Sequence, residues 1–396
     1  MPRRGSAGSF SGPLSAIAVV SIALGVVVMV MAISILRGFQ ADIRDKVSGF
    51  GGHITVNSYG SYRAYEELPI EADSMLTARL SAIEGVKHAQ RYATKGGMVK
   101  TDDQIYGIIL RGLEPGYDTT FFSTCLTKGR LPAIGCKSNE VMISSTIASR
   151  LKLGVGDKMR TYFWEGDSYR SRAFTVSGIY NTDLTEMDEV YLVGDLAQVQ
   201  RLNDWSAPQV GGIELTVDDF DALNATARRV ADAVPFDFRV QTIVDQNPSL
   251  FSWLDLLNAN ITLILTLMCI VCAVAIVSAL LIMIFEKSAT IGLLKALGAT
   301  SSSVRRIFLL KAVQLIAAGV VIGDGVSLLF SIVQTRWHLL TLDPESYSMT
   351  HVPIDINAWV YLGVSVGTVA VCLLALLLPT AHISRISPAR TMRVEN

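Results

Sequence analysis

The residue types that most often perform acid–base, nucleophilic or metal chemistry are few in this sequence, and they are dispersed. Its five histidines occur singly, which favours a solvated or structural role for each: His53, His88, His338, His351 and His382. The chain has no G-x-x-x-x-G-K-[ST] phosphate-binding run, no H-E-x-x-H run and no G-x-S-x-G run. The sequence therefore predicts a protein that is not an enzyme, hydrolyses no ATP itself and holds no metal or cofactor.

The cysteines divide into two groups by position. Cys269, Cys272 and Cys372 lie in long apolar runs, where a cysteine is usually a small packing residue. Cys125 and Cys136 lie in a long segment of mixed composition, where a disulfide is chemically allowed if that segment is outside the cytoplasm. Two cysteines are weak evidence, so the sequence leaves this disulfide open.

Composition places the chain among membrane proteins. Of its 396 residues, 50% are hydrophobic and only 17% are charged, and the mean hydropathy is +0.40. Such a chain is too apolar for an ordinary soluble protein of this size. The formal net charge of -1 gives no electrostatic reason to bind nucleic acid.

Four apolar runs are each long enough to cross a bilayer as a helix, which takes roughly 20 residues. The first is predicted to be an uncleaved anchor, because its apolar run is longer than the apolar region of a typical signal peptide. Residues 37–257 alternate short strands, amphipathic helices and Gly/Asp/Asn turns, which predicts a folded α+β domain. The predicted fold class is therefore membrane α-helical, with four transmembrane helices and a large α+β domain inserted between the first two.

Basic residues near the helix ends predict the orientation of the chain. They cluster at three places: Arg3 and Arg4; Lys287, Lys295, Arg305 and Arg306; and Arg385, Arg390 and Arg393. Both termini and residues 286–304 are therefore expected in the cytoplasm. The loop 335–357, which carries one arginine and three acids, is expected on the far side together with the large domain.

The first apolar run continues as a helical stripe beyond its predicted membrane segment. The stripe consists of Ile35, Leu36, Phe39, Ile43 and Val47, and a second one, Leu250, Trp253, Leu254 and Leu257, enters the second apolar run. These extensions are interpreted either as paired helical stalks of the large domain or as ordinary interfacial helix ends with Trp253 as a belt residue.

A short amphipathic helix is predicted between the second and third membrane helices. Ile291, Leu294 and Leu297 recur at helical spacing, Gly298 is placed to end the helix, and residues 300–303 can cap the next one. Such a helix either sits in a groove of a partner protein and transmits its motion or lies on the lipid surface. The residues alone leave both open.

Two glycine pairs and one acid stand out inside the third and fourth membrane helices. Gly319-x-x-x-Gly323 and Gly363-x-x-x-Gly367 are interpreted as helix-packing positions that allow close approach. Asp324 lies between two glycines, where a carboxylate costs roughly 3 kcal/mol at mid-membrane depth. We favour a locally hydrogen-bonded or protonated acid over a hydrated crevice between protomers.

Four stretches of sequence carry a resemblance to a known family. They are Phe285-Glu286-Lys287 through Gly292-Leu293-Leu294-Lys295-Ala296-Leu297-Gly298-Ala299; Ile22-Ala23-Leu24-Gly25 with Gly38-Phe39; Gly49-Phe50-Gly51-Gly52-His53-Ile54; and Ser384-Arg385-Ile386-Ser387-Pro388-Ala389-Arg390. Together they resemble the FtsX/MacB/lipoprotein-releasing permease family of ABC transporters, over essentially the whole chain and most closely its LolC/LolE-like branch. One departure is that an amphipathic elbow helix found in relatives looks shortened or missing before the first membrane helix.

The resemblance implies a non-catalytic permease subunit in the bacterial inner membrane. Its implied partners are a separate cytoplasmic ABC ATPase that binds the ATP, a second permease subunit (identical or a paralogue), a lipoprotein substrate and a periplasmic carrier. The implied ATPase-coupling residues are Glu286, Lys287, Gly292, Leu293, Leu294, Lys295, Leu297 and Gly298. MacB-like efflux, FtsX-like regulation and a non-transport membrane sensor are the alternatives.

With this resemblance, the chain divides into nine predicted segments. They are a cytoplasmic N-terminus (1–13), TM1 (14–36), a periplasmic α+β domain with stalks (37–257), TM2 (258–285), a cytoplasmic coupling helix (286–304), TM3 (305–334), a short periplasmic loop (335–357), TM4 (358–380) and a cytoplasmic C-terminus (381–396).

Overall fold

The computed structural model describes residues 11–60, 67–100, 104–165, 168–343 and 349–377. The basic residues predicted at both chain ends and the Ser384–Arg390 stretch lie outside these residues. The chain forms two compact units: a helical unit (Met1–Gln40, Trp253–Thr341 and His351–Asn396) and a sheet unit (Ala41–Ser252 and Leu342–Thr350). Each is described below by itself.

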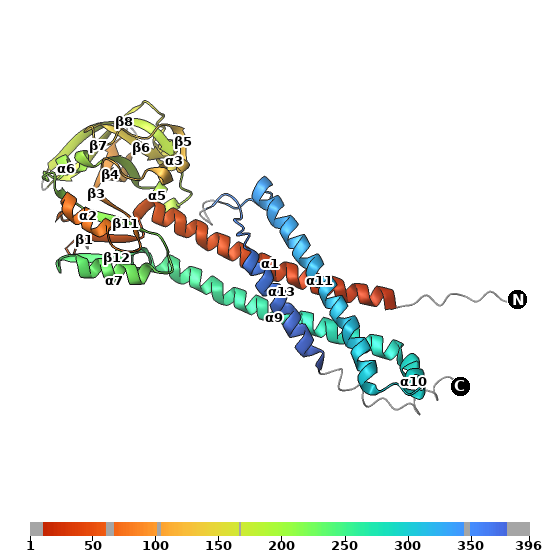
Figure 1. Cartoon of the computed structure of the whole chain (residues 1–396). Helices are drawn as coiled ribbons and strands as arrows, with labels where there is room; N and C mark the ends of the chain where they lie inside the picture. Colours follow the sequence, from red (N-terminus) through yellow and green to blue (C-terminus); the bar gives the residue numbers. More distant parts are fainter. Residues whose placement is uncertain (1–10, 61–66, 101–103, 166–167, 344–348, 378–396) are drawn as a thin grey trace. The chain divides into compact units, whose positions relative to one another are not determined.

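The helical unit is built from long apolar helices, which Figure 1 shows with one short helix between two of them. They are α1 (Ser11–Gly51), α9 (Pro248–Glu286), α10 (Ser288–Ala296), α11 (Ser301–Trp337) and α13 (Ala358–Ala375). Within the described residues, α1, α9, α11 and α13 are long and apolar enough to cross a membrane. The four predicted membrane helices are confirmed, and the large domain lies between the first and the second.

Two of these helices are longer than a bilayer requires. At 1.5 Å per residue, the 41 residues of α1 and the 39 residues of α9 each span about 60 Å, twice the roughly 30 Å hydrocarbon core. The ring of Phe39 meets that of Trp253 edge to face at 5.5 Å. Gln40 Nε2 donates to the Leu254 carbonyl at 3.3 Å and to Asn258 Oδ1 at 3.1 Å. Both α1 and α9 therefore remain helical beyond their membrane-spanning lengths, and they contact each other there.

Small residues let α1 and α11 approach closely. A methyl group placed on Gly319 would lie 2.8 Å from Ile22, and one on Gly323 would lie 2.8 Å from the Ala23 carbonyl and the Val26 side chain. Gly363 and Gly367 on α13 have nothing within 4 Å of such a methyl group. Of the two glycine pairs in the sequence, the structure thus places only the first at a tight helix contact within the chain.

The segment between α11 and α13 is tied to the helices by hydrogen bonds. Buried Gln334 donates to the Leu340 and Val352 carbonyls at 3.0 and 3.3 Å, and accepts from Leu340 N at 2.9 Å. The backbone N–H of Asp355 donates to the Ser34 carbonyl on α1 at 3.0 Å. The loop is therefore held against α1 by main-chain contact.

The sheet unit contains one ten-stranded mixed sheet with short helices packed on it (Figure 1). The strands are β1 (Ile54–Ser58), β3 (Val86–Lys100), β4 (Ile105–Leu113), β5 (Leu126–Gly129), β6 (Glu140–Ser144), β7 (Lys158–Glu165), β8 (Ser168–Tyr180), β9 (Tyr191–Asp195), β11 (Gly212–Val217) and β12 (Phe238–Thr242), in the order β12-β1-β11-β3-β4-β9-β6-β8-β5, with β7 against β3 and β8. A separate pair is formed by β2 (Ile70–Glu71) and β10 (Gln209–Val210). The helices are α2 (Ser74–Ser81), α3 (Thr120–Cys125), α4 (Ser145–Leu151), α5 (Thr185–Asp188), α6 (Leu196–Leu202), α7 (Leu223–Ala233) and α8 (Ile243–Gln246). An α+β domain is the predicted class.

The last turn of α1 belongs to the core of the sheet unit. Phe50 is buried, and its ring packs edge to face on Phe122 at 5.7 Å and on Tyr191 at 4.9 Å. Gly52 follows with φ of 72°, a conformation that suits glycine, and turns the chain into β1. The helix end is thus anchored by aromatic packing on the domain.

A buried ion pair lies beside this anchor. Arg111 on β4 donates to the carboxylate of Glu214 on β11 at 2.5 Å, and the two side chains are only 5% and 4% exposed. The Tyr117 hydroxyl donates to the same carboxylate at 2.8 Å. The guanidinium lies between the rings of Phe50 and Tyr92, at 5.1 and 5.0 Å from their centroids. The pair therefore links two strands separated by β3 and contacts the end of α1.

Candidate functional site

The short helix α10 is set between α9 and α11 by defined helix ends. Lys287 separates α9 from α10, and Gly298 ends α10 with φ of 95°. The backbone N–H groups of Gly298 and Ala299 donate to the carbonyls of Lys295 and Leu294, at 3.1 and 2.9 Å. This is the glycine-terminated hydrogen-bond pattern that closes many helices. The Thr300 side chain then accepts from Ser303 N at 3.2 Å and caps α11.

The apolar face of α10 differs from the predicted stripe. Ile291 is 1% exposed and belongs to the core of the helical unit, while Leu293 and Leu297 are 62% and 77% exposed. Leu294, which was assigned to the same stripe as Ile291 and Leu297, is 36% exposed and lies at the edge between the two faces. One side of α10 thus holds it on the membrane helices, and the other presents two leucines.

The remaining residues of the predicted coupling set take different positions. Gly292 is buried, Lys295 is half-buried, and Gly298 is exposed. Glu286 lies at the end of α9 and forms an ion pair with Lys287, at 3.8 Å between Oε1 and Nζ. The structure therefore gathers the eight residues on one helix and its two ends, with Leu293 and Leu297 as the large apolar side chains that point outward.

Asp324 has a partner inside the helical unit. Ser365 on α13 donates its hydroxyl to Asp324 Oδ2 at 2.6 Å, while the other carboxylate oxygen, Oδ1, is buried without a hydrogen bond among the described residues. This contact is what the locally hydrogen-bonded interpretation expects. It also links α11 to α13.

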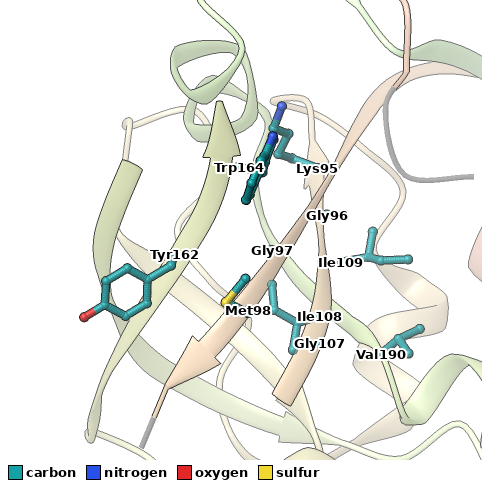
Figure 2. Close-up of a pocket in the computed structure, with 10 residues that line it drawn as sticks. All are labelled: Lys95, Gly96, Gly97, Met98, Gly107, Ile108, Ile109, Tyr162, Trp164 and Val190. Carbon is teal, nitrogen blue, oxygen red and sulfur yellow. The ribbon is translucent and has the colours of Figure 1, made fainter. Parts of the chain in front are cut away.

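The sheet unit carries a hollow of about 410 Å³ over β3, β4 and β7. Part of its lining is bare backbone, because Gly96, Gly97 and Gly107 contribute no side chains. Figure 2 shows Trp164 and Ile109 on opposite sides of the strand that carries the first two glycines. The hollow is mainly apolar, and Trp164 at its edge is 47% exposed.

Among the residues of this unit that the structure describes, neither a disulfide nor a metal-binding cluster is found. Cys125 and Cys136 are free cysteines in the structure. In the part of the chain that the structure describes, no group of three or more His, Cys, Asp or Glu side chains could hold a metal ion. No local sequence pattern could have predicted the buried ion pair of Arg111 and Glu214, because 103 positions separate the two residues.

Four membrane helices, a short helix between the second and third, and an α+β domain inserted after the first define a class of multi-pass membrane protein with one extramembrane domain. Sequence comparison then gives the family. The chain belongs to the family with a MacB-like periplasmic core domain, which matches residues 15–233, and residues 262–388 match the FtsX-like permease C-terminal domain. It is a multi-pass inner-membrane permease whose sheet unit is periplasmic.

Individual relatives cover nearly the whole chain. The lipoprotein-releasing system transmembrane protein LolC of Xylella fastidiosa is 22% identical over 96% of this chain and 94% of its own length. The corresponding LolE protein of Haemophilus influenzae is 22% identical over 94% of this chain and 92% of its own. The crystal structure of the periplasmic region of MacB from Actinobacillus actinomycetemcomitans aligns with 50% of this chain and 91% of its own, at 13% identity and a TM-score of 0.36.

Proposed function

We propose that this chain is the non-catalytic permease subunit of an ABC-type lipoprotein-releasing system, driven by ATP that a separate ATPase binds and hydrolyses. The observation that carries the proposal is α10, a helix between two membrane helices that exposes Leu293 and Leu297. Large exposed leucines on a short helix that a glycine ends suit insertion into a groove on a partner protein. The full-length similarity to LolC and LolE proteins supports a lipoprotein as the proposed substrate.

The mechanism that fits this structure is mechanical. Motion of the ATPase would displace α10, whose buried Ile291 packs in the same core as α9 and α11. The helices α1 and α9 continue without a break beyond the length of a membrane crossing. A displacement at the α10 end can thus pass along helices to the periplasmic domain, where Phe50 anchors α1. In this proposal both chain ends and α10 lie in the cytoplasm.

The substrate is proposed to be a lipoprotein that leaves the outer leaflet of the inner membrane for a soluble periplasmic carrier, with a second permease subunit completing the path. The β7–β8 hairpin is the surface we propose for contact with the carrier. Trp164 and Tyr169 on it are 47% and 53% exposed, and their rings meet at 4.7 Å. An exposed aromatic pair beside an apolar hollow is typical of a protein–protein contact.

The ATPase contact is tested by affinity purification of the full-length protein from its own membranes in mild detergent. Wild type, Leu297→Asp and Ser301→Asp are compared, and the co-purifying ATPase is identified and its activity measured. Ser301 is exposed and begins α11, so this control adds the same charge close by without removing a leucine. We expect wild type and the control to retain the ATPase, and Leu297→Asp to lose it by at least about tenfold, or about 1.4 kcal/mol.

Two results would contradict the proposal. Equal ATPase recovery with Leu297→Asp would show that α10 is not the contact, and no ATPase with any variant would favour a membrane sensor. Lipoprotein release is tested separately, by reconstituting the purified complex with a lipoprotein and adding ATP and carrier. Release that does not depend on ATP would exclude the proposed role.

A further inference from the structure

A groove of about 700 Å³ lies in the helical unit, where the end of α9, the short helix α10 and the first turns of α11 meet. It is within the range of about 300–1,000 Å³ that is typical of small-ligand sites. The residues that matter for the argument are Lys287, Thr290, Ile307, Leu310, Lys311 and Gln314. Lys287 and Leu294 of the predicted coupling set also line this groove, but the exposed leucines that carry the proposed ATPase contact, Leu293 and Leu297, do not.

Lys311 is in an unusual position for a lysine. It follows the apolar run Ile307–Leu310 on α11 and is followed by Ala312 and Val313, inside the helix that crosses the membrane. A lysine inside a membrane helix is costly and usually pairs with an anion or reaches the interface. No ion pair or hydrogen bond to Lys311 is found among the described residues, and no acid is among the residues that line the groove.

The groove combines this cation with a second one and with an apolar wall. Lys287 lines the same space, and among the described residues it forms one long ion pair, with Glu286 at 3.8 Å. Thr290 and Gln314 add a hydroxyl and an amide. Ile307 and Leu310 are each 57% exposed on the wall. A ligand that matches the two cations, the two polar side chains and the apolar wall has an anionic head and hydrocarbon chains.

We propose that this groove binds an anionic phospholipid from the leaflet on the α10 side, with its phosphate between Lys287 and Lys311 and its acyl chains along Ile307 and Leu310. Basic pockets between membrane helices are known places for anionic headgroups. A free inorganic anion would leave the apolar wall unused, and a neutral headgroup would leave the net positive charge of the groove uncompensated. The bound lipid lies against α10 and supports its packing on α11.

The test is lipid binding to the purified full-length protein. Wild type, Lys311→Gln, Lys311→Arg and Arg305→Gln are stripped of lipid in detergent and titrated with phosphatidylglycerol or phosphatidylethanolamine, and bound lipid is counted by native mass spectrometry. Arg305 is the matched control, because it is an exposed cation on the same helix and does not line the groove. Helical circular dichroism and thermal unfolding verify that each variant is folded.

Wild type, Lys311→Arg and Arg305→Gln should bind phosphatidylglycerol at least about fivefold more tightly than phosphatidylethanolamine. Lys311→Gln should lose about fivefold in phosphatidylglycerol affinity, the effect of one lysine near a lipid surface. Equal affinity for the two lipids, or an unchanged Lys311→Gln, would overturn the proposal. So would displacement of the lipid by inorganic phosphate alone, or a photo-crosslinker at Ile307 that captures protein in membranes instead of lipid.

Discussion

Replacing Arg111 by methionine should destabilise the periplasmic domain far more than replacing Arg111 and Glu214 together. The single change removes the cation but leaves the Glu214 carboxylate buried, with the Tyr117 hydroxyl as its remaining hydrogen-bond donor among the described residues. The double variant Arg111→Met/Glu214→Gln removes both charges and keeps an oxygen that can accept from Tyr117. The pair is well suited to this comparison because both side chains are almost fully buried.

The expected magnitudes follow from the burial of the pair. Removing one partner of a buried ion pair costs roughly 3–5 kcal/mol, whereas replacing both with neutral groups of similar size costs far less. Since Arg111 also lies between the rings of Phe50 and Tyr92, loss of its planar group adds to the single-variant cost. A loss of about 4 kcal/mol corresponds to a fall in Tm of roughly 8–16 °C for a domain of about 200 residues.

The assay is thermal unfolding of the full-length protein in detergent, followed by the fluorescence of tryptophan, which the sheet unit contains at positions 164 and 205. Glu214→Gln alone completes the double-mutant cycle and gives the coupling energy, expected at about 2–3 kcal/mol. A single variant Arg111→Met that loses less than about 1 kcal/mol, or a double variant no more stable than it, would refute the reasoning.

Three further predictions follow from single residues. Gly298→Ala should cost about 1 kcal/mol in thermal unfolding, because the positive φ that ends α10 strains any other residue. Gly319→Leu should prevent stable insertion, because the α1 contact at Ile22 has no room for a side chain. Gly363→Leu is the control and should be tolerated, because Gly363 has open space around it. Protease resistance in membranes measures both. Burial raises the pKa of Glu67 from its ordinary 4.5 to about 7, so the folded domain keeps a proton that the unfolded chain releases. Stability should therefore fall as pH rises from about 4.5 to about 7 and remain lower above it, and Glu67→Gln should reduce this dependence in pH-dependent melting curves.

Structural features that depend on local sequence patterns can be predicted without the structure. The strand Gly212–Val217 alternates apolar and polar residues after a turn, which is a pattern that predicts a strand. The strand Val86–Lys100 shows no such pattern over most of its length. Its earlier part is polar and contains two glycines, and it is a strand because β11 and β4 pair with it on both sides.

The candidate site could be predicted only in part, because it also depends on tertiary contacts that local sequence patterns do not show. Helical spacing located α10 and its glycine end, but it put Leu294 and Leu297 on one face with Ile291. Which leucines are exposed depends on how α10 packs against α9 and α11, and this is decided by tertiary contacts. Lys311 was passed over because a lysine in an apolar run carries no local sign of the groove it faces.

The contact between Gly38 and the loop before α13 limits which motions α1 can perform. A methyl group at Gly38 would lie 2.7 Å from the Pro353 carbonyl oxygen, so the loop fills the space that a side chain would need. Turning the helix by one residue, about 100°, would bring Arg37 or Phe39 into that space. At this point α1 cannot rotate about its own axis unless the loop is displaced first.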